Sequence, residues 1–394
     1  MSELSYLEKL LDGVEVEWVT LGSMADIGTG SSNRQDESEN GIYPFYVRSK
    51  NILKSDTFEF DEVAIVIPGE GGIGDIFHYV EGKYALHQRA YRIRITTNAV
   101  DTKFLYYFMS SSFKQYILTK SVGATAISIR KPMLEGFKVP IPSPDNPEKS
   151  LAIQSEIVRI LDKFTALTAE LTAELTMRKK QYNHYRDLLL SFKEGEVEWK
   201  ALEEVSDIYD SLHQTPQYSK NGLSMIRVTD IKNGYIDLKN TLKVNDGIFS
   251  IFTKKYLPQK NDLVMSRVGS YGNVGIIPTD NSACMGQNTV VIHPHINNRY
   301  LFYILTSSIG QDFIEKNVGG GSQKTLSLKS IKSIPIPLTG ESEQSKIVSI
   351  LDKFDTLTTS ISEGLPREIE LRQKQYEYYR DLLFSFPRPE TASN

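Results

Sequence analysis

A glycine-rich stretch is the strongest candidate for ligand chemistry in this sequence. Residues 69–74 read Gly-Glu-Gly-Gly-Ile-Gly and formally match the G-x-G-x-x-G pattern of dinucleotide-binding proteins. That pattern requires a following helix and an acidic residue about twenty positions later. Here Gly82 would interrupt such a helix, and Arg92 and Arg94 occupy the later positions. We therefore interpret 69–74 as a loop whose glycines let a ligand approach the backbone closely, and not as a nucleotide site.

Residue patterns for catalysis are otherwise missing from the sequence. It contains no Asn/Asp-Pro-Pro-aromatic tetrapeptide of a methyltransferase and no P-loop Gly-Lys-Ser/Thr. His293 and His295 have no third ligand at metal-binding spacing. The single cysteine, Cys284, excludes an intrachain disulfide and a cysteine-rich zinc site. We predict a pair of exposed histidines at a strand end, and no catalytic or metal centre.

Residues suited to nucleic-acid binding are common. Residues 83–138 hold ten Lys/Arg and only two acids, although the whole chain of 394 residues has a net charge of −4. Lys, Arg, Gln, Asn, Ser and Tyr on loops are the groups that contact phosphates and base edges. The candidates in the first half are Arg48, Lys50, Gln88, Arg89, Arg130 and Lys131, and those in the second half are Arg227, Lys232, Arg267, Ser270, Tyr271, Gln287, Asn288, Gln323, Lys324 and Lys329. Arg267 and Lys324 are the best placed; an ordinary solvated basic face is the alternative.

Two long helices must position these loops. Residues 151–192 place apolar side chains at steps of three and four, which is typical of a helix that pairs with another helix. A related pattern recurs at 346–386, so we expect the two helices to partner each other. The second copy is longer and contains Gly364 and Pro366. Because proline within a helix costs about 3 kcal/mol, we predict a break there, with a new helix beginning at Pro366.

The repeat includes the segments before each helix. Glu-Val-Glu-Trp occurs at 15–18 and again at 196–199, and Pro-rich exits at 139–142 and 334–337 are expected to stop a strand or helix. Between the copies we align 104–107 with 300–303, Gln88 with Gln287, and 127–131 with 326–330. The predicted divisions are 1–14 (a helix that completes the C-terminal region), 15–149, 150–195 (central helix), 196–340 and 341–394 (C-terminal helix and tail). The N-terminus is expected beside the C-terminus.

These features resemble the specificity (S) subunit of type I restriction–modification systems. The opening 5–18 and the tandem Thr-Ala-Glu-Leu at 168–175 resemble the IC family in particular. The resemblance implies an α+β fold with two similar mixed α/β target recognition domains, joined by two long antiparallel helices that form an intramolecular coiled coil with pseudo-twofold symmetry. Each domain would read one half of a bipartite site in double-stranded DNA.

The resemblance also implies partners and the role of the helices. Two modification (M) subunits would bind S-adenosylmethionine and methylate DNA, and restriction (R) subunits would cleave with ATP and Mg; this chain would be non-catalytic and hold no cofactor. The helices would set the gap between half-sites and dock the M subunits. The residues assigned to these two roles are Phe164, Leu167, Leu171, Leu175, Tyr182, Tyr185, Phe354, Leu357, Tyr376 and Tyr379.

Composition favours a cytoplasmic protein. The opening residues lack the basic and apolar segments of a secretory signal, and no apolar run approaches the ~18 residues of a membrane span. Two other functions stay open from the residues alone. One is a self-contained DNA methyltransferase or nuclease, and the other is a coiled-coil scaffold without a DNA role.

Overall fold

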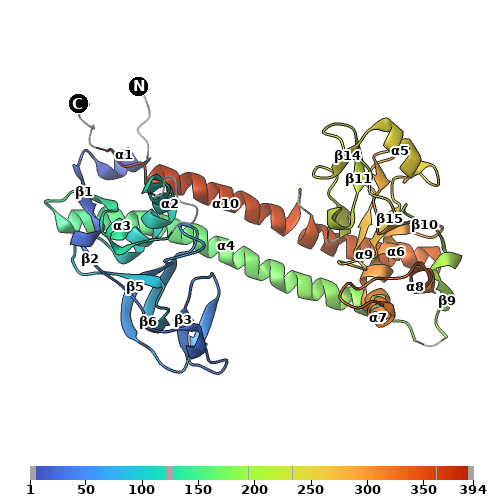
Figure 1. Ribbon diagram of the computed structural model, residues 1–394, viewed down its shortest axis with the longest axis horizontal. Helices are drawn as coiled ribbons and strands as arrows, with labels where there is room; N and C mark the ends of the chain where they lie inside the picture. Colours follow the sequence, from blue (N-terminus) through green and yellow to red (C-terminus); the bar gives the residue numbers. More distant parts are fainter. Residues whose placement is uncertain (1–5, 121–127, 194, 233, 361, 389–394) are drawn as a thin grey trace. The chain divides into compact units, whose positions relative to one another are not determined.

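The computed structural model describes residues 6–120, 128–193, 195–232, 234–360 and 362–388. Its contacts divide the chain into two compact units (Figure 1). Unit 1 comprises residues 1–170 and 370–394, and unit 2 comprises residues 171–369. Each unit therefore holds one sheet-rich region and parts of the long helices. Among the described residues, no helix is long and apolar enough to cross a membrane.

The main sheet of each unit has six strands. The first four follow the same spatial order in both units, whereas the last two are exchanged relative to their order along the chain. In unit 1 the order is β2-β7-β5-β6-β3-β4, and in unit 2 it is β10-β18-β15-β16-β13-β12. Only one pair in each sheet is parallel, β3 with β6 and β13 with β16, and these pairs occupy equivalent places. The strands of unit 1 are β2 (Ala25–Thr29), β3 (Tyr43–Tyr46), β4 (Ile52–Ser55), β5 (Phe60–Pro68), β6 (His78–Leu86) and β7 (Ala90–Ile95). Those of unit 2 are β10 (Ser206–Asp210), β12 (Ile231–Lys232), β13 (Gly234–Ile236), β15 (Leu263–Ser266), β16 (Val274–Ile276) and β18 (Thr289–Pro294). The predicted repeat of an α+β domain is confirmed.

Unit 2 carries an additional small layer. Strands β14 (Leu242–Val244), β11 (Leu223–Ile226) and β17 (Ala283–Met285) form a three-stranded sheet, and the helix α5 (Asp246–Thr253) contacts β17. The Asn245 side chain caps α5 by accepting the Ile248 amide at 2.8 Å, which satisfies one of the amides left open at a helix start. This layer distinguishes the two sheet-rich regions.

The proline-rich exits lie within strands, so the prediction that they stop a strand is wrong. β8 (Lys138–Pro142) pairs with β1 (Val16–Thr20), and β19 (Pro335–Leu338) pairs with β9 (Glu198–Ala201), each as a two-stranded antiparallel sheet. Trp18 lies opposite Pro140, and Trp199 lies opposite Pro337. A strand with only one neighbour tolerates prolines at alternate positions, because the missing N–H groups can face away from the partner.

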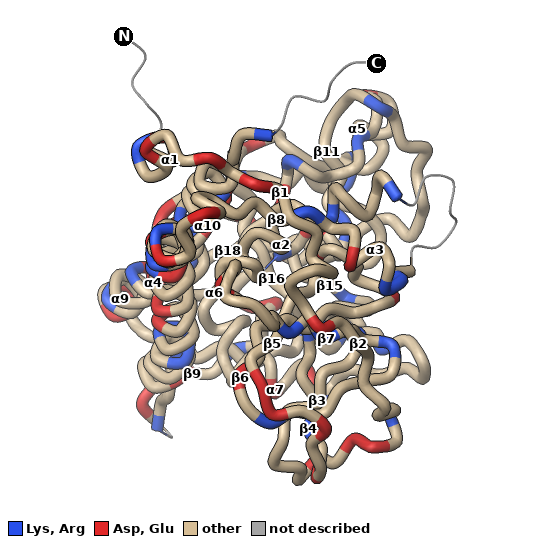
Figure 2. Tube along the Cα trace, turned by 90° about the vertical axis from the view of Figure 1, so that its left-hand side faces the viewer, with Lys and Arg blue, Asp and Glu red and all other residues tan. Residues whose placement is uncertain are grey.

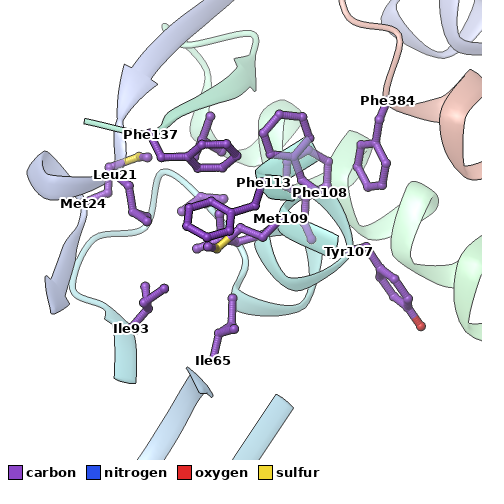
Figure 3. Close-up of a cluster of buried hydrophobic side chains, with 14 of the residues drawn as sticks. Leu21, Met24, Ile65, Ile93, Tyr107, Phe108, Met109, Phe113, Phe137 and Phe384 are labelled. Carbon is purple, nitrogen blue, oxygen red and sulfur yellow. The ribbon is translucent and has the colours of Figure 1, made fainter. Parts of the chain in front are cut away.

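An aromatic helix forms the core of unit 1. α2 (Thr102–Lys120) buries Phe104, Phe108 and Phe113 in the same cluster as the sheet residues Ile65 and Ile93. Figure 3 shows Phe108, Phe113, Ile65 and Ile93 within this cluster. Fully burying one such side chain contributes ~1.5–3 kcal/mol, so this cluster supplies much of the unit's stability. In unit 2 the corresponding helices are α6 (Asn298–Thr306) and α7 (Ser308–Asn317). The short helices α3 (Lys131–Glu135) and α8 (Leu328–Lys332) precede β8 and β19.

The long helices pair within each unit as predicted. α4 (Pro147–Leu189) covers most of the predicted central helix but ends before residue 195, and the second copy is split into α9 (Glu341–Thr359) and α10 (Gly364–Leu383). In unit 1 Phe164 of α4 stacks on Tyr379 of α10, with ring centroids 5.3 Å apart. In unit 2 Tyr185 of α4 stacks on Phe354 of α9 at 5.6 Å. The break near Gly364 and Pro366 is confirmed, but the new helix begins at Gly364 and not at Pro366 as predicted. Gly364 adopts φ = 79°, a backbone conformation that favours glycine.

The two ends of the chain meet inside unit 1. The helix α1 (Tyr6–Leu11) buries Leu7 in the same core cluster as Leu383 and Phe384. The Trp18 indole Nε1 donates to the Pro387 carbonyl oxygen at 2.8 Å. The expected closure between the N-terminal helix and the C-terminal region is therefore present. The other domain boundaries stay predictions, because the division into units cuts through the long helices.

Candidate nucleic-acid interface

A backbone clamp fixes the glycine loop of unit 1. The Gly69 amide donates to the Arg89 carbonyl at 2.9 Å, and the Ile129 amide donates to the Gly69 carbonyl at 2.8 Å. Three segments distant in sequence therefore meet at the end of β5: the loop itself, the β6–β7 turn, and the approach to α3. β6 follows the loop, beginning at His78, so no helix follows the glycines and a dinucleotide fold is excluded.

Unit 2 repeats the clamp with different residues. The Arg267 amide donates to the Asn288 carbonyl, and the Leu326 amide donates to the Arg267 carbonyl, both at 2.8 Å. The pairing of Gln88 with Gln287 fits this correspondence, since each residue precedes the residue whose carbonyl accepts the bond, Arg89 or Asn288. The alignment of 127–131 with 326–330 is wrong by two positions, because Ile129 takes the place of Leu326; residues 121–127 lie outside the described residues.

Two of the predicted arginines in unit 1 converge on one carboxylate. Arg48 Nη1 lies 3.0 Å from Glu70 Oε2, and Arg89 Nη1 lies 3.2 Å from the same oxygen. All three side chains are exposed to between 43 and 55%. The remaining candidates of this unit, Lys50, Gln88, Arg130 and Lys131, are also exposed, the last in a loose ion pair with Glu135 at 3.9 Å. The structure therefore gathers most of the predicted residues around the clamp.

Arg267 of unit 2 has a different placement from the one we expected. Its guanidinium is only 13% exposed, donating from Nη1 to Asp210 at 2.7 Å and from Nε to the Leu326 carbonyl at 3.1 Å. These bonds tie the loop after β15 to β10 and to the approach to α8. Within the described part of the chain, Arg267 thus holds the loop in place, and the expectation that it is the best-placed base contact is not supported by this geometry.

Lys324 and Tyr271 form the exposed cluster of unit 2. The Tyr271 hydroxyl donates to Glu315 Oε2 at 2.7 Å, and Lys324 Nζ lies 3.3 Å from Glu315 Oε1 and 5.9 Å from the Tyr271 ring centroid. The Glu315 carboxylate raises the pKa of the Lys324 amine and, by accepting the tyrosine hydrogen, raises the pKa of Tyr271. Both donors are therefore held beside the glycine loop of this unit, residues 269–273, which follows β15 and contains Gly269 and Gly272.

The other predicted residues of unit 2 are spread more widely. Arg227 is tied to the buried Asp230 at 3.0 Å, which raises the pKa of the guanidinium. Gln287 accepts a hydrogen bond from the Thr215 hydroxyl at 3.3 Å. Lys232, Ser270, Gln323 and Lys329 are exposed, and Asn288 is half-buried with φ = 64°. The structure thus separates Arg227 and Lys232, on the β11–β12 side, from the cluster at the glycine loop.

The basic segment 83–138 does not form an unpaired basic face. Arg92 lies 2.7 Å from Asp26 and 3.1 Å from Glu62, and Lys114 lies 2.7 Å from Asp75. The bond from Arg92 lowers the pKa of Asp26. Figure 2 shows acidic and basic residues interspersed along the trace. Acids early in the sequence therefore neutralise many of these cations locally.

Each sheet-rich region is attached to its own long helix by an equivalent contact. In unit 1 the Tyr107 hydroxyl donates to Asp162 of α4 at 2.6 Å, and Lys103 lies 2.8 Å from the same carboxylate. Burial and this hydrogen bond raise the pKa of Tyr107. These residues come from the segments that the sequence aligns between the two copies.

In unit 2 the Tyr303 hydroxyl donates to Asp352 of α9, also at 2.6 Å. Arg299 takes the place of lysine and bonds to both Asp352 and Asp355. Burial and these acids raise the pKa of Tyr303. The alignment of 104–107 with 300–303 is therefore confirmed by geometry.

Both histidines lie beside acids; His295 is exposed as predicted, whereas His293 is half-buried. His293 Nδ1 lies 2.7 Å from the buried Asp262, and His295 Nε2 lies 3.0 Å from Asp207. The Tyr256 hydroxyl also donates to Asp262, at 2.8 Å. Over the residues that the structure describes, no group of three or more His, Cys, Asp or Glu side chains is arranged to hold a metal ion.

Comparison with known families agrees with this geometry. The family described as type I restriction modification DNA specificity domain matches residues 13–177 and 194–371, one match for each copy of the repeat. This chain belongs to that family. Specificity subunits are the non-catalytic components of type I systems. As a member of this family, the chain is likewise a non-catalytic component.

Relatives of this specificity-family chain match it over its length. It is 39% identical to the type I restriction enzyme EcoR124I/EcoR124II specificity subunit of Escherichia coli, over all of both chains. It is 34% identical to the EcoprrI specificity subunit of the same species, over 92% of this chain and 93% of that one.

Solved structures share the fold of this specificity-family chain at low identity. The S subunit from M. genitalium matches with a TM-score of 0.57 and 16% identity, covering 96% of this chain and 98% of that one. A chain from a structure of type I R-M complex assembly and conformational transition matches with a TM-score of 0.53 and 15% identity, covering 94% of this chain and 97% of that one.

The predicted helix residues of this specificity-family chain differ in their burial. Tyr182 and Tyr376 pack toward the cores of units 2 and 1, where burial raises the pKa of each to about 12. Phe164, Leu171, Leu175, Phe354 and Leu357 are half-buried, and Leu167, Tyr185 and Tyr379 are exposed. The division between the units falls after Glu170, within the tandem Thr-Ala-Glu-Leu segment.

Sequence reasoning missed the acids of this specificity-family chain. Glu70, Glu315 and Asp210 bind five of the predicted donors, namely Arg48, Arg89, Tyr271, Lys324 and Arg267. Glu70 lies inside the glycine motif and could have been found there. Glu315 and Asp210 lie 44 and 57 residues from their partners Tyr271 and Arg267, and no local pattern marks them.

Proposed function

We propose that this chain is the DNA-recognition subunit of a type I restriction–modification complex, with the sheet-rich region of each unit reading one half of a bipartite site in double-stranded DNA. The observation that carries the proposal is the repeated loop clamp. The same backbone bonds occur around Gly69 and around Arg267, while the side chains that they present differ. A shared scaffold with different exposed donors is suited to reading two different half-sites.

The two clusters favour direct readout from the major groove. Arg48 and Arg89 in unit 1, and Lys324 and Tyr271 in unit 2, lie on loops beside glycines, where the backbone can approach DNA closely. Exposed neighbours such as Lys50 and Arg130 are suited to phosphate contacts, which position a protein without reading sequence. The other predicted residues of both units stay candidates for these two roles.

The long helices are proposed to set the gap between half-sites and to dock two M subunits. Their surfaces carry large apolar side chains with high exposure, including Tyr378 at 65%, Leu188 at 58% and Met177 at 49%. Exposed apolar patches mark interaction sites in soluble proteins. The tandem Thr-Ala-Glu-Leu and the opening segment 5–18 favour the IC family as the subtype.

Catalysis is proposed to reside in the partners. M subunits would bind S-adenosylmethionine and methylate the DNA, and R subunits would use ATP with Mg to cleave it in the cytoplasm. This chain would recognise the DNA sequence, set the gap between the half-sites and dock the M subunits. The prediction that it holds no cofactor of its own stays a prediction.

Methylome sequencing tests the proposed function. The chain is co-expressed with its M subunit in a host that lacks adenine methylation, and modified bases are mapped across the genome. We expect one bipartite motif with a fixed gap, present only when both proteins are expressed. Methylation by the chain alone, or methylation with no sequence preference, would contradict the proposal and favour one of the two alternative functions.

A further inference from the structure

The carboxylate shared by two arginines in unit 1 is arranged to read a base pair. Glu70, Arg48 and His87 line a surface hollow of about 620 Å³ beside the glycine loop. Arg89 lies on the adjoining β6–β7 turn, within bonding distance of Glu70. Three loops meet here, and none of these side chains is used by the attachment to the long helices.

The hydrogen bonds leave specific atoms available. Both arginines use Nη1, and both bond to Oε2 of Glu70. Among the described residues, no group accepts from Nε or Nη2 of Arg89, and none donates to Oε1 of Glu70. The cluster therefore presents one complete guanidinium edge with two donors, and one carboxylate oxygen with acceptor capacity.

The turn that carries Arg89 is held on both sides. The Arg89 amide donates to His87 Nδ1 at 3.0 Å, and the Arg89 carbonyl accepts from the Gly69 amide at 2.9 Å. Arg48 lies instead in the bend between β3 and β4, and among the described residues no such pair of bonds fixes its backbone. Of the two arginines, Arg89 is thus the one with a preorganised position.

We propose that Arg89 and Glu70 together read a G·C pair in the half-site recognised by unit 1. The Nε and Nη2 donors of Arg89 match the N7 and O6 acceptors of guanine, and Glu70 Oε1 accepts from the N4 amino group of cytosine. An adenine at the same place would turn its N6 amino group toward an arginine donor, which disfavours A·T. Arg48 keeps Glu70 oriented and offsets its charge. This inference rests on the proposed function.

The second unit provides a contrast. Glu315 uses Oε2 for Tyr271 and Oε1 for Lys324, so both of its oxygens already accept hydrogen bonds. It offers no oxygen comparable to Oε1 of Glu70. The inference therefore applies to unit 1 alone, and Glu315→Gln serves as a matched control on an exposed carboxylate beside a glycine loop.

Four variants test the inference in the complex with the M subunit. Methylomes are mapped for Arg89→Lys, Glu70→Gln, Arg48→Lys and Glu315→Gln, and binding is then measured on duplexes in which each base pair of the site is changed. A bidentate contact discriminates roughly 5- to 150-fold against a wrong base, so we expect Arg89→Lys and Glu70→Gln to lose discrimination by that factor. The loss should fall at one and the same G·C position.

The controls separate this outcome from misfolding and from a failed functional proposal. Arg48→Lys keeps a cation beside Glu70 and should reduce discrimination at that pair less than Arg89→Lys does, and Glu315→Gln should leave that half-site intact. Methylation of the second half-site at an unchanged gap shows that the variants fold. The inference is overturned if Arg89→Lys and Glu70→Gln leave every position unchanged, affect different positions, or affect an A·T pair. If the parent complex yields no bipartite motif, the proposed function fails instead.

Discussion

Asp352→Ala should lower the free energy of unfolding of unit 2 without changing that of unit 1. The Asp352 carboxylate accepts from the Tyr303 hydroxyl at 2.6 Å and from Arg299 Nε at 2.9 Å. Tyr303 is fully buried, so the substitution leaves its hydroxyl hydrogen without this acceptor, at a cost of ~1–3 kcal/mol. Arg299 keeps Asp355 at 3.0 Å, and Asp352 is itself 42% exposed, so the lost ion pair adds at most about 1 kcal/mol. We expect unit 2 to lose about 2 kcal/mol.

The two tryptophans of the chain allow each unit to be followed separately. Trp18 lies in β1 of unit 1 and Trp199 in β9 of unit 2. In a Trp18→Phe background, urea unfolding followed by fluorescence reports unit 2, and Asp352→Ala should shift that transition to lower urea. In a Trp199→Phe background the same substitution should leave the transition of unit 1 in place. Asp162→Ala, which removes the equivalent acceptor for Tyr107, should do the reverse.

A double-mutant cycle separates the hydrogen bond from other effects of the substitution. If the bond to Tyr303 carries the loss, Tyr303→Phe and Asp352→Ala should show a coupling energy of about 1 kcal/mol or more. A shift below about 0.5 kcal/mol for Asp352→Ala, or strict additivity of the two substitutions, would refute the reasoning. An equal shift of both tryptophan signals would also refute it, because the contact would then not belong to unit 2 alone.

Three other predictions follow from the same physical arguments. Insertion of one Thr-Ala-Glu-Leu unit after Leu171 adds about 6 Å of helix, against ~3.4 Å per base pair, so methylome mapping should show a gap longer by one or two base pairs; altered half-sites with an unchanged gap would contradict it. Arg159 lowers the pKa of Glu156 to about 2, so Glu156 stabilises unit 1 above its usual pKa of about 4.5 and this stabilisation disappears as the pH falls toward 2. Glu156→Gln should therefore lower the urea midpoint at pH 7 but not near pH 2, and an equal loss at both would count against it. Burial raises the pKa of Cys284 to about 12, so a thiol reagent should label the chain only after urea unfolding; rapid labelling of the native protein would contradict this.

Periodicity and repetition predicted the frame of the protein well. The alignment of 104–107 with 300–303 places Tyr107 and Tyr303 on equivalent carboxylates, because the residues that attach a domain to its helix must recur in both copies. The break near Pro366 follows from the missing amide and fixed φ of proline, which are local properties. The helix break and the recurring attachment residues can therefore be predicted from the sequence, because they depend on local backbone geometry and on repetition.

The candidate site was less predictable because its geometry depends on distant partners. Arg267 was expected at the DNA surface because it follows a strand. Instead its guanidinium pairs with Asp210 of another strand, and the side chain is largely buried. Glu70 pairs with both Arg48 and Arg89, and these three residues meet only in the folded chain. The prolines of 139–142 were predicted to stop a strand, but they lie within β8. A strand tolerates such prolines when it has only one partner strand, and the sequence alone does not show how many partners a strand has.

An exchange of the recognition segments tests the central claim most directly. Residues 19–138 of the chain are replaced by residues 200–333, so that both units carry the second recognition segment, and the methylome is mapped with the M subunit present. Since each segment is proposed to read its own half-site, the site should become two inverted copies of the second half-site. A complex that assembles with M but still methylates the original two-part sequence would contradict the account.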